Sequence, residues 1–305
     1  MGQRGGGGAL YGQNTISRSA SLGLGLGAVL GGALLGSLVY AREVEPQWVV
    51  VERVTLTLPR LAPSFDGYRI VQISDLHMDG WMTPERFGRM VDLVNEQEPD
   101  VVAITGDFVS GSARHISGLP GPLGRLQAPD GVVAVLGNHD YLNDAGGVRE
   151  ALSSAGVVDV SNAVCTLWRE GAALHLCGVD CVMYGYDNLD EVLEALEEAE
   201  PGCAVLLAHE PDFADKSAAI GRFDLQLSGH SHGGQVRLPF LGSPLFVPPF
   251  SLYPDVPPLA RKYTSGLYKV RNMHQYTNRG LGVMCLRLRL LCRPEITVLT
   301  VRSLG

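Results

Sequence analysis

Five short apolar segments of this chain each lead directly into a turn that carries metal-binding types of side chain. In the clearest case, Val132–Leu136 lies between two glycines and is followed by Gly137-Asn138-His139-Asp140. Short β-branched segments bounded by glycine are typical of buried strands. The corresponding segments elsewhere are Tyr68–Ile73, Asp100–Ile104, Cys203–Leu207 and Phe223–Leu227. We therefore expect five strand ends to converge on one polar site.

The turns after these strands use the same few residue types. One Gly-Asn-His-Asp turn says little, because these are ordinary turn residues, but five such turns in order are far less expected by chance. Carboxylate, amide and imidazole donors without a thiolate suit ions such as Mn, Fe or Zn. The turns are Asp75-Leu76-His77, Gly106-Asp107, Gly137-Asn138-His139-Asp140, His209-Glu210 and Gly229-His230-Ser231-His232.

In this order and context, the motifs resemble those of the calcineurin-like metallophosphoesterases, over roughly residues 68 to 236. The resemblance implies an α/β (α+β) fold in which two packed mixed β-sheets are flanked by α-helices. The flanking segments Gly233–Val236 and Cys292–Thr297 are similar to membrane-associated bacterial phosphodiesterases, a branch that includes enzymes acting on UDP-diacylglucosamine. A metal-dependent phosphoric ester hydrolase, and specifically a phosphodiesterase, is therefore expected.

The family pattern also implies a set of ligands for two divalent metal ions. Seven motif residues would bind the ions, and the carboxylate of Asp107 would bridge them. The first ion would be held by Asp75, His77, Asp107 and His232. The second would be held by Asp107, Asn138, His209 and His230.

Two ions about 3.5–4 Å apart can share a water, lower its pKa so that hydroxide forms near neutral pH, and stabilise charge on a phosphoryl oxygen. His139 is not a ligand in the family scheme and would be the general acid that protonates the departing oxygen. Asp140 would orient His139 and favour its protonated form, because a nearby carboxylate stabilises an imidazolium. Phosphoprotein phosphatase or nuclease activity on the same site, or a non-catalytic metal-binding scaffold, are the alternatives.

The amino-terminal region differs in composition from the rest of the chain. Residues 1–21 contain Gly5–Gly8 and too little apolar content to pack a core, so a disordered tail is expected. Residues 22–41 carry no charge and would span about 30 Å as a helix, which predicts a transmembrane helix or signal anchor. A cleaved signal ending at Ala41 and a flexible tail are the alternatives. Residues 46–305 form the predicted catalytic domain.

Charge and context indicate the substrate class and the location. The net charge is −8 and no Lys/Arg-rich block occurs, which argues against nucleic acid as the partner. The apolar segment and the family branch favour a phosphodiester or pyrophosphate in a lipid or cell-envelope molecule, with the bilayer as a partner and no protein partner predicted. The flanking arginines slightly favour an extracytoplasmic catalytic domain. UDP-diacylglucosamine is handled on the cytoplasmic side, so an outward-facing domain would favour another envelope diester.

Other elements follow from periodicity and turn residues. Thr83 can cap a helix that runs to Glu96 and buries one apolar face. Residues 108–130 and the Pro-rich, apolar stretch 237–262 are predicted loops, and the second could cover the site. The remaining expected elements are a strand over Gln47–Pro59, a hairpin at Glu170-Gly171, a helix over Leu189–Ala199, and several strands of the second sheet over Leu267–Val301.

Overall fold

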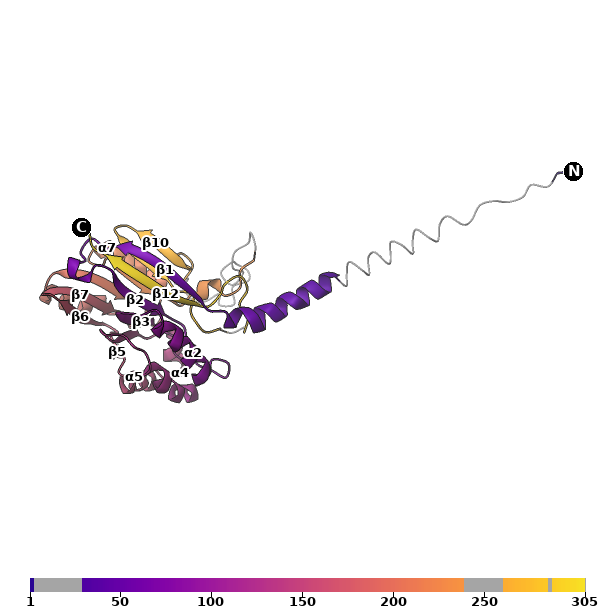
Figure 1. Ribbon diagram of the computed structural model, residues 1–305, viewed down its shortest axis with the longest axis horizontal. Coiled ribbons are helices and arrows are strands. Elements are labelled where there is room, and N and C mark those ends of the chain that lie inside the picture. The colour runs from indigo at the N-terminus through magenta and orange to yellow at the C-terminus, as the bar shows by residue number, and fades with distance from the viewer. Residues whose placement is uncertain (3–28, 239–259, 285–286, 305) are drawn as a thin grey trace.

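The computed structural model describes residues 1–2, 29–238, 260–284 and 287–304. Two six-stranded β-sheets pack against each other, and helices cover their outer faces (Figure 1). Both sheets are mixed. The predicted α/β architecture of two packed mixed sheets flanked by helices is therefore confirmed.

The first sheet holds three of the five motif strands at its centre. It has the order β1-β12-β2-β3-β4-β5, in which β12 is antiparallel to β2 and the other neighbours are parallel. The prediction that the chain ends in the second sheet is wrong for β12, which inserts between β1 and β2 of the first. The strands are β1 (Val50–Thr57), β2 (Tyr68–Ile73), β3 (Val101–Thr105), β4 (Val132–Val135), β5 (Val158–Asp159) and β12 (Glu295–Arg302).

The second sheet holds the other two motif strands, β8 and β9, which are parallel to each other. Its order is β10-β11-β9-β8-β7-β6. The predicted hairpin at Glu170-Gly171 joins β6 to β7 as an antiparallel pair. The strands are β6 (Ala163–Arg169), β7 (Ala172–Gly178), β8 (Gly202–Leu207), β9 (Leu225–Ser228), β10 (Gly266–Val270) and β11 (Met273–Thr277).

The core has one layer between the sheets and one layer outside each sheet. In β2, Ile70 faces the layer between the sheets, whereas Val71 packs toward the helices over the first sheet. Strands buried on both faces need apolar residues at nearly every position, which is why the motif strands read as continuous apolar segments. Because these parallel strands are fixed by burial on both faces, the turns that follow them are held in place.

Helices on the two outer faces begin and end at residues that suit helix termini. In the predicted helix at 83–96, the hydroxyl of Thr83 accepts a hydrogen bond from the N–H of Arg86. The predicted loop at 108–130 contains two short helices, and Pro120 begins the second of them. The helices are α2 (Pro84–Asn95), α3 (Pro120–Leu123), α4 (Asn138–Asn143), α5 (Ala145–Ser154), α6 (Leu189–Glu198) and α7 (Ala214–Ile220), with short 3-10 turns η3 (Pro63–Phe65), η4 (Ala113–Gly118), η5 (Pro211–Phe213) and η6 (His232–Gly234).

Residues 29–39 are helical and project away from the sheets, followed by η1 (Tyr40–Val44) and η2 (Glu45–Gln47) (Figure 1). Within the described residues, no helix combines the length and the apolar character needed to cross a bilayer, so the membrane helix predicted at 22–41 is not found there. Residues 22–28 of that segment, nearly all of the predicted tail at 1–21, and residues 239–259 of the predicted Pro-rich loop lie outside the described residues.

Candidate metal centre

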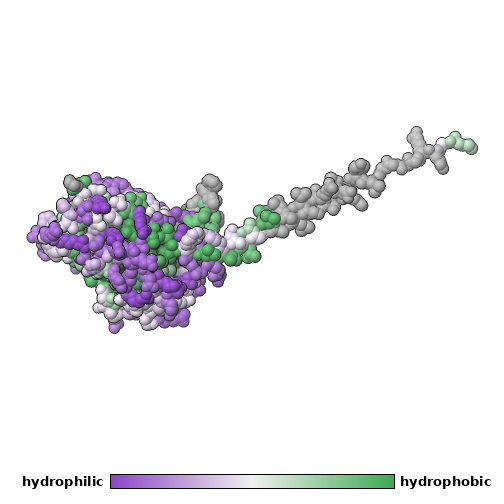
Figure 2. All heavy atoms as spheres, viewed as in Figure 1, coloured by the Kyte–Doolittle hydropathy of each residue, from purple (hydrophilic) through white to green (hydrophobic). Residues whose placement is uncertain are grey.

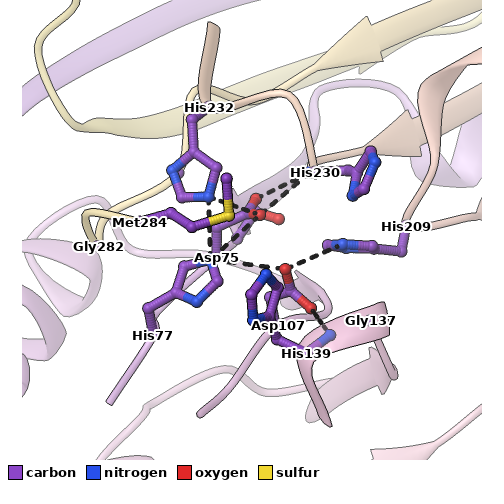
Figure 3. Close-up of polar contacts among 12 residues, drawn as sticks. Asp75, His77, Asp107, Gly137, His139, His209, His230, His232, Gly282 and Met284 are labelled. Atoms are coloured by element: carbon purple, nitrogen blue, oxygen red, sulfur yellow. Dashed lines mark hydrogen bonds and ion pairs between the residues drawn. The ribbon is translucent and has the colours of Figure 1, made fainter. Parts of the chain in front are cut away.

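The five predicted turns meet at one edge of the two sheets, at the carboxyl ends of β2, β3, β4, β8 and β9. Several of the motif side chains sit on left-handed backbone, with φ of 51° at Asp75, 57° at Asp107 and 65° at His230. Non-glycine residues in this region are uncommon, and they cluster at functional sites. Figure 3 shows the side chains that converge there: Asp75, His77, Asp107, His139, His209, His230 and His232.

The first cluster contains Asp75, His77 and His232, all of them buried. The Nε2 atoms of the two histidines are 2.9 Å apart, and the Asp75 Oδ1 atom lies 3.4 Å from His232 Nε2. Two ligands that bind one ion at right angles, each about 2.1 Å away, lie about 3.0 Å from each other. The spacing of the imidazoles therefore fits an ion held between them.

The second cluster contains Asp107, His209 and His230. Asp107 Oδ2 is 3.3 Å from His209 Nε2, and His230 Nδ1 is 2.9 Å from the amide oxygen of Asn138. The four side chains predicted as ligands of one ion are therefore neighbours in space.

Asp107 faces both clusters through a single carboxylate oxygen. Its Oδ2 lies 3.5 Å from His77 Nε2 on one side and 3.3 Å from His209 Nε2 on the other. Its Oδ1 accepts a hydrogen bond of 2.8 Å from the backbone N–H of His139. A carboxylate placed between two imidazole clusters has the position that a bridging ligand requires.

The protonation of His209 fits metal binding. Its Nδ1 lies 2.6 Å from the carbonyl oxygen of Thr105, so it donates its proton there. Its Nε2 is buried and faces the Asp107 carboxylate at 3.3 Å, so this nitrogen would be the one to bind an ion in place of a proton. An imidazole held by a backbone carbonyl through one nitrogen, with the other facing a carboxylate cluster, is the arrangement typical of metal-ligating histidine. The residues present therefore fit divalent ions.

Burial controls the charges of the first cluster. It lowers the pKa of His77 to about 3, and it raises the pKa of the Asp75 carboxyl to about 7. A neutral imidazole is the form that binds a metal. In the second cluster, burial disfavours both charges of the facing pair, yet their mutual attraction holds the pKa of Asp107 below its usual range and that of His209 above it.

The Asp140 carboxylate accepts hydrogen bonds from four backbone N–H groups, and its predicted influence on the His139 ring stays a prediction. Its Oδ1 accepts from the N–H groups of Phe108 and Val109, and its Oδ2 accepts from those of Asp107 and Gly137. Burial and the neighbouring Asp107 carboxylate raise the pKa of Asp140 to about 7. The N–H groups have the opposite effect and lower this pKa, because they stabilise the ionised carboxylate. The role of Asp140 in the structure is to fix two motif turns against each other.

His139 lies next to both clusters. Its ring packs edge-on against His77, with centroids 4.8 Å apart. The side chains of His139, His77 and Asp107 also form a third group of closely spaced potential ligand atoms. The side chain is half-buried, and its carbonyl accepts from the Asn143 amide at 2.7 Å. An accessible imidazole thus lies at the rim of the buried carboxylates.

Three features of the site were missed in the sequence. Arg289 is fully buried and binds the loop that contacts Asp75, although an arginine in a sequence indicates a surface charge. Glu210 is also buried and holds the loop that follows β7. At Gly137, a Cβ would collide with the Asp107 carboxyl. Gly137 can be read from the sequence, but the need for a residue without a Cβ at this position is seen only in the packed structure.

Three other histidines lie outside the ligand clusters of the described residues. His175 bonds to Thr166 and to the carbonyl of Glu200, and neither His115 nor His274 belongs to a ligand cluster among the described residues. Met82, close to the first motif in the sequence, is buried in the core.

Comparison with known proteins places the chain among phosphoesterases. Residues 68–234 match the family model described as calcineurin-like phosphoesterase. The metallophosphoesterase YkuE of Bacillus subtilis is 36% identical, covering 91% of this chain and 94% of its own length. The phosphodiesterase YaeI of Escherichia coli is 29% identical, covering 85% of this chain and 91% of its own length. A transmembrane protein with metallophosphoesterase domain from Danio rerio is 30% identical over 82% of this chain, which spans 56% of that relative.

Proposed function

Because the chain belongs to the calcineurin-like phosphoesterase family and is a metal-dependent phosphoester hydrolase, we propose that it hydrolyses a phosphodiester or pyrophosphate bond in a lipid or cell-envelope substrate. The observation that carries this proposal is the Asp107 carboxylate, whose Oδ2 faces an imidazole of each cluster at 3.5 Å and 3.3 Å. Phosphodiester preference is further supported by the phosphodiesterase name of the Escherichia coli relative.

The two clusters would each hold one divalent ion, with Asp107 common to both. Bound ions would supply a water of lowered pKa and positive charge next to the phosphoryl oxygens. Nitrogen and oxygen donors suit Mn, Fe or Zn. The ligands assigned to the first ion are Asp75, His77, Asp107 and His232, and those assigned to the second are Asp107, Asn138, His209 and His230.

His139 would donate a proton to the departing oxygen. Its ring lies against His77 with centroids 4.8 Å apart, and its backbone N–H is bound to Asp107, so its position is tied to that of the bridging carboxylate. A positioned acid of this kind contributes about 10²–10⁴-fold to rate. Asp140 supports it indirectly, because it binds the backbone on both sides of the site.

An apolar surface supports a lipid substrate and a membrane-associated enzyme. Exposed apolar residues gather on the projecting helix and where it joins the catalytic domain (Figure 2). Contiguous exposed apolar surface marks interaction with protein or membrane. We place the catalytic domain on the extracytoplasmic side, as the flanking arginines favour. The residues are Val29, Leu30, Leu34, Leu35, Leu38, Val39, Val44, Trp48 and Leu291.

The test compares four substrates with the full-length protein and added Mn²⁺: UDP-diacylglucosamine, a bis-aryl phosphodiester, an aryl phosphomonoester and single-stranded DNA. We expect faster turnover of diesters than of the monoester or DNA, and loss of turnover in His139→Ala. Trp168→Ala, which changes an exposed residue on an edge strand, is the matched control and should behave as wild type. Much faster cleavage of the monoester would refute the diester assignment, and turnover of UDP-diacylglucosamine would indicate a cytoplasmic-facing domain.

A further inference from the structure

Three tyrosines gather beside the metal centre, and the proposed chemistry leaves them without a role. Tyr141 lies on α4, two residues after His139, and Tyr184 and Tyr186 come from the loop between β7 and α6. The Tyr141 and Tyr186 ring centroids are 4.7 Å apart, and Tyr184 lies 6.0 Å from Tyr141. The cluster therefore joins the segment that carries the proposed acid to a second, distant segment of the chain.

The outer two rings remain exposed despite their size. Tyr184 is 40% exposed and Tyr186 is 52% exposed, and their planes are inclined by 37° with centroids 6.2 Å apart. The rings are thus not stacked face to face on each other. Tyr141 is held in place by two hydrogen bonds, because its hydroxyl donates to Asp180 at 2.6 Å and accepts from Arg149 at 3.0 Å.

The loop that carries Tyr184 and Tyr186 is hydrogen-bonded to a residue next to the metal centre. Glu210, next to the proposed ligand His209, is fully buried and accepts from the backbone N–H groups of Val182 at 3.2 Å and Met183 at 2.9 Å. Gly185 has a φ of 70°, which allows the turn between the two tyrosines. A preorganised loop reduces the entropy cost of binding a ligand to side chains that it exposes.

We propose that Tyr184 and Tyr186, supported by Tyr141, form a platform on which a planar nucleobase of the substrate stacks while its phosphate lies at the metal centre. The platform is connected to the site in two ways: α4 carries both His139 and Tyr141, and Glu210, next to His209, holds the backbone just before Tyr184. This assignment rests on the proposed function and narrows its substrate class to nucleotide-containing diesters or pyrophosphates.

The chemistry of the platform favours a base over an alkyl chain. Its members are tyrosines, and charged or amide groups surround them: Asp180 and Arg149 bind Tyr141, and the Asn162 amide donates to the Tyr186 carbonyl at 2.8 Å. An alkyl chain is better matched by an aliphatic groove, whereas a base gains from aromatic faces with polar edges. Burial and then the nearby Cys181 and Asp107 raise the pKa of Tyr184, which agrees with a position close to the site.

The experiment uses three diesters that release the same leaving group, p-nitrophenolate, from the full-length protein with Mn²⁺. They carry thymidine, methyl or hexadecyl as the second group, so only the retained group differs. Wild type should prefer the thymidine diester over the methyl diester. In Tyr184→Ala and Tyr186→Ala this preference, measured as the ratio of kcat/KM, should fall by about 5- to 150-fold, mainly through KM. The Tyr→Phe variants should keep it, and Trp168→Ala is the control for an exposed aromatic elsewhere.

Three results would overturn the proposal. The first is an unchanged thymidine preference in both alanine variants. The second is loss of a hexadecyl preference instead, which would assign the surface to an apolar chain. The third is failure of wild type to cleave any diester while it cleaves p-nitrophenyl phosphate, which would overturn the proposed function itself and is thereby distinguished from failure of the platform alone.

Discussion

Arg289→Met should destabilise the protein, because Arg289 is a fully buried cation whose partners are all backbone carbonyls. The guanidinium donates five hydrogen bonds of 2.6–3.1 Å to the carbonyls of Arg279, Gly280, Gly282 and Cys292. The segment that contains Gly280 and Gly282 also contacts the metal centre, because the Gly282 N–H donates a hydrogen bond to the Asp75 carbonyl at 2.7 Å. Methionine keeps the length and flexibility of the side chain but offers no donor.

The size of the effect follows from the carbonyls left without a donor. Gly280 keeps a second donor, the Glu295 N–H at 3.2 Å. The other three carbonyls lose their guanidinium bonds, and each buried unsatisfied acceptor costs about 1–3 kcal/mol. The loss of about 3–9 kcal/mol is offset by several kcal/mol, because a buried charge no longer has to be desolvated. We expect a net destabilisation of about 2–5 kcal/mol, out of a typical total of about 5–15 kcal/mol.

Urea unfolding followed by circular dichroism, with EDTA present, measures this directly. Arg287→Met is the matched control, since Arg287 lies two residues away, is half-exposed and pairs with Asp79 at 3.4 Å on the surface. Such a pair is worth about 0–1 kcal/mol. If Arg289→Met lowers the free energy of unfolding no more than Arg287→Met does, the assignment of Arg289 as a structural clamp is refuted.

Three further predictions follow from packing and linkage. Gly137→Ala should reduce activity by about 100-fold, because its Cβ would displace Asp107, and Gly121→Ala, whose Cβ meets nothing, should not; equal steady-state rates for the two variants would contradict this. Removing metal with EDTA should lower the melting temperature by calorimetry, since ions at 100 times Kd add about 2.7 kcal/mol, and an unchanged melting temperature would argue against tight binding. Burial raises the pKa of the Cys177 thiol to about 12, so a thiol reagent at pH 8 should modify it, by peptide mapping, after unfolding and not before.

The sequence predicted the motif strands and the convergence of their polar turns, because burial on both faces leaves a continuous apolar pattern and each turn follows its strand directly. It did not predict the partner of β12. Which strand pairs with which depends on contacts between distant segments, and Glu295–Arg302 has an apolar pattern that fits either sheet.

Side-chain partners were harder to predict than positions. Asp140 is next to His139 in sequence, but as the third residue of α4 its carboxylate points back to the N–H of Gly137 and across to those of Asp107 and its neighbours. Helix geometry thus outweighed sequence proximity. The three-tyrosine platform is formed by two segments that are distant in the sequence and meet only in the fold. The hydrophobic periodicity of the sequence therefore could not predict it.

The most direct test of the account is the metal content of Asp107→Asn, measured by inductively coupled plasma mass spectrometry alongside diester turnover. We expect two ions per chain in wild type, loss of the paired ions together with activity in Asp107→Asn, and two ions without activity in His139→Ala. An Asp107→Asn protein that retains two ions and hydrolyses the diester at the wild-type rate would contradict the bridging role of Asp107.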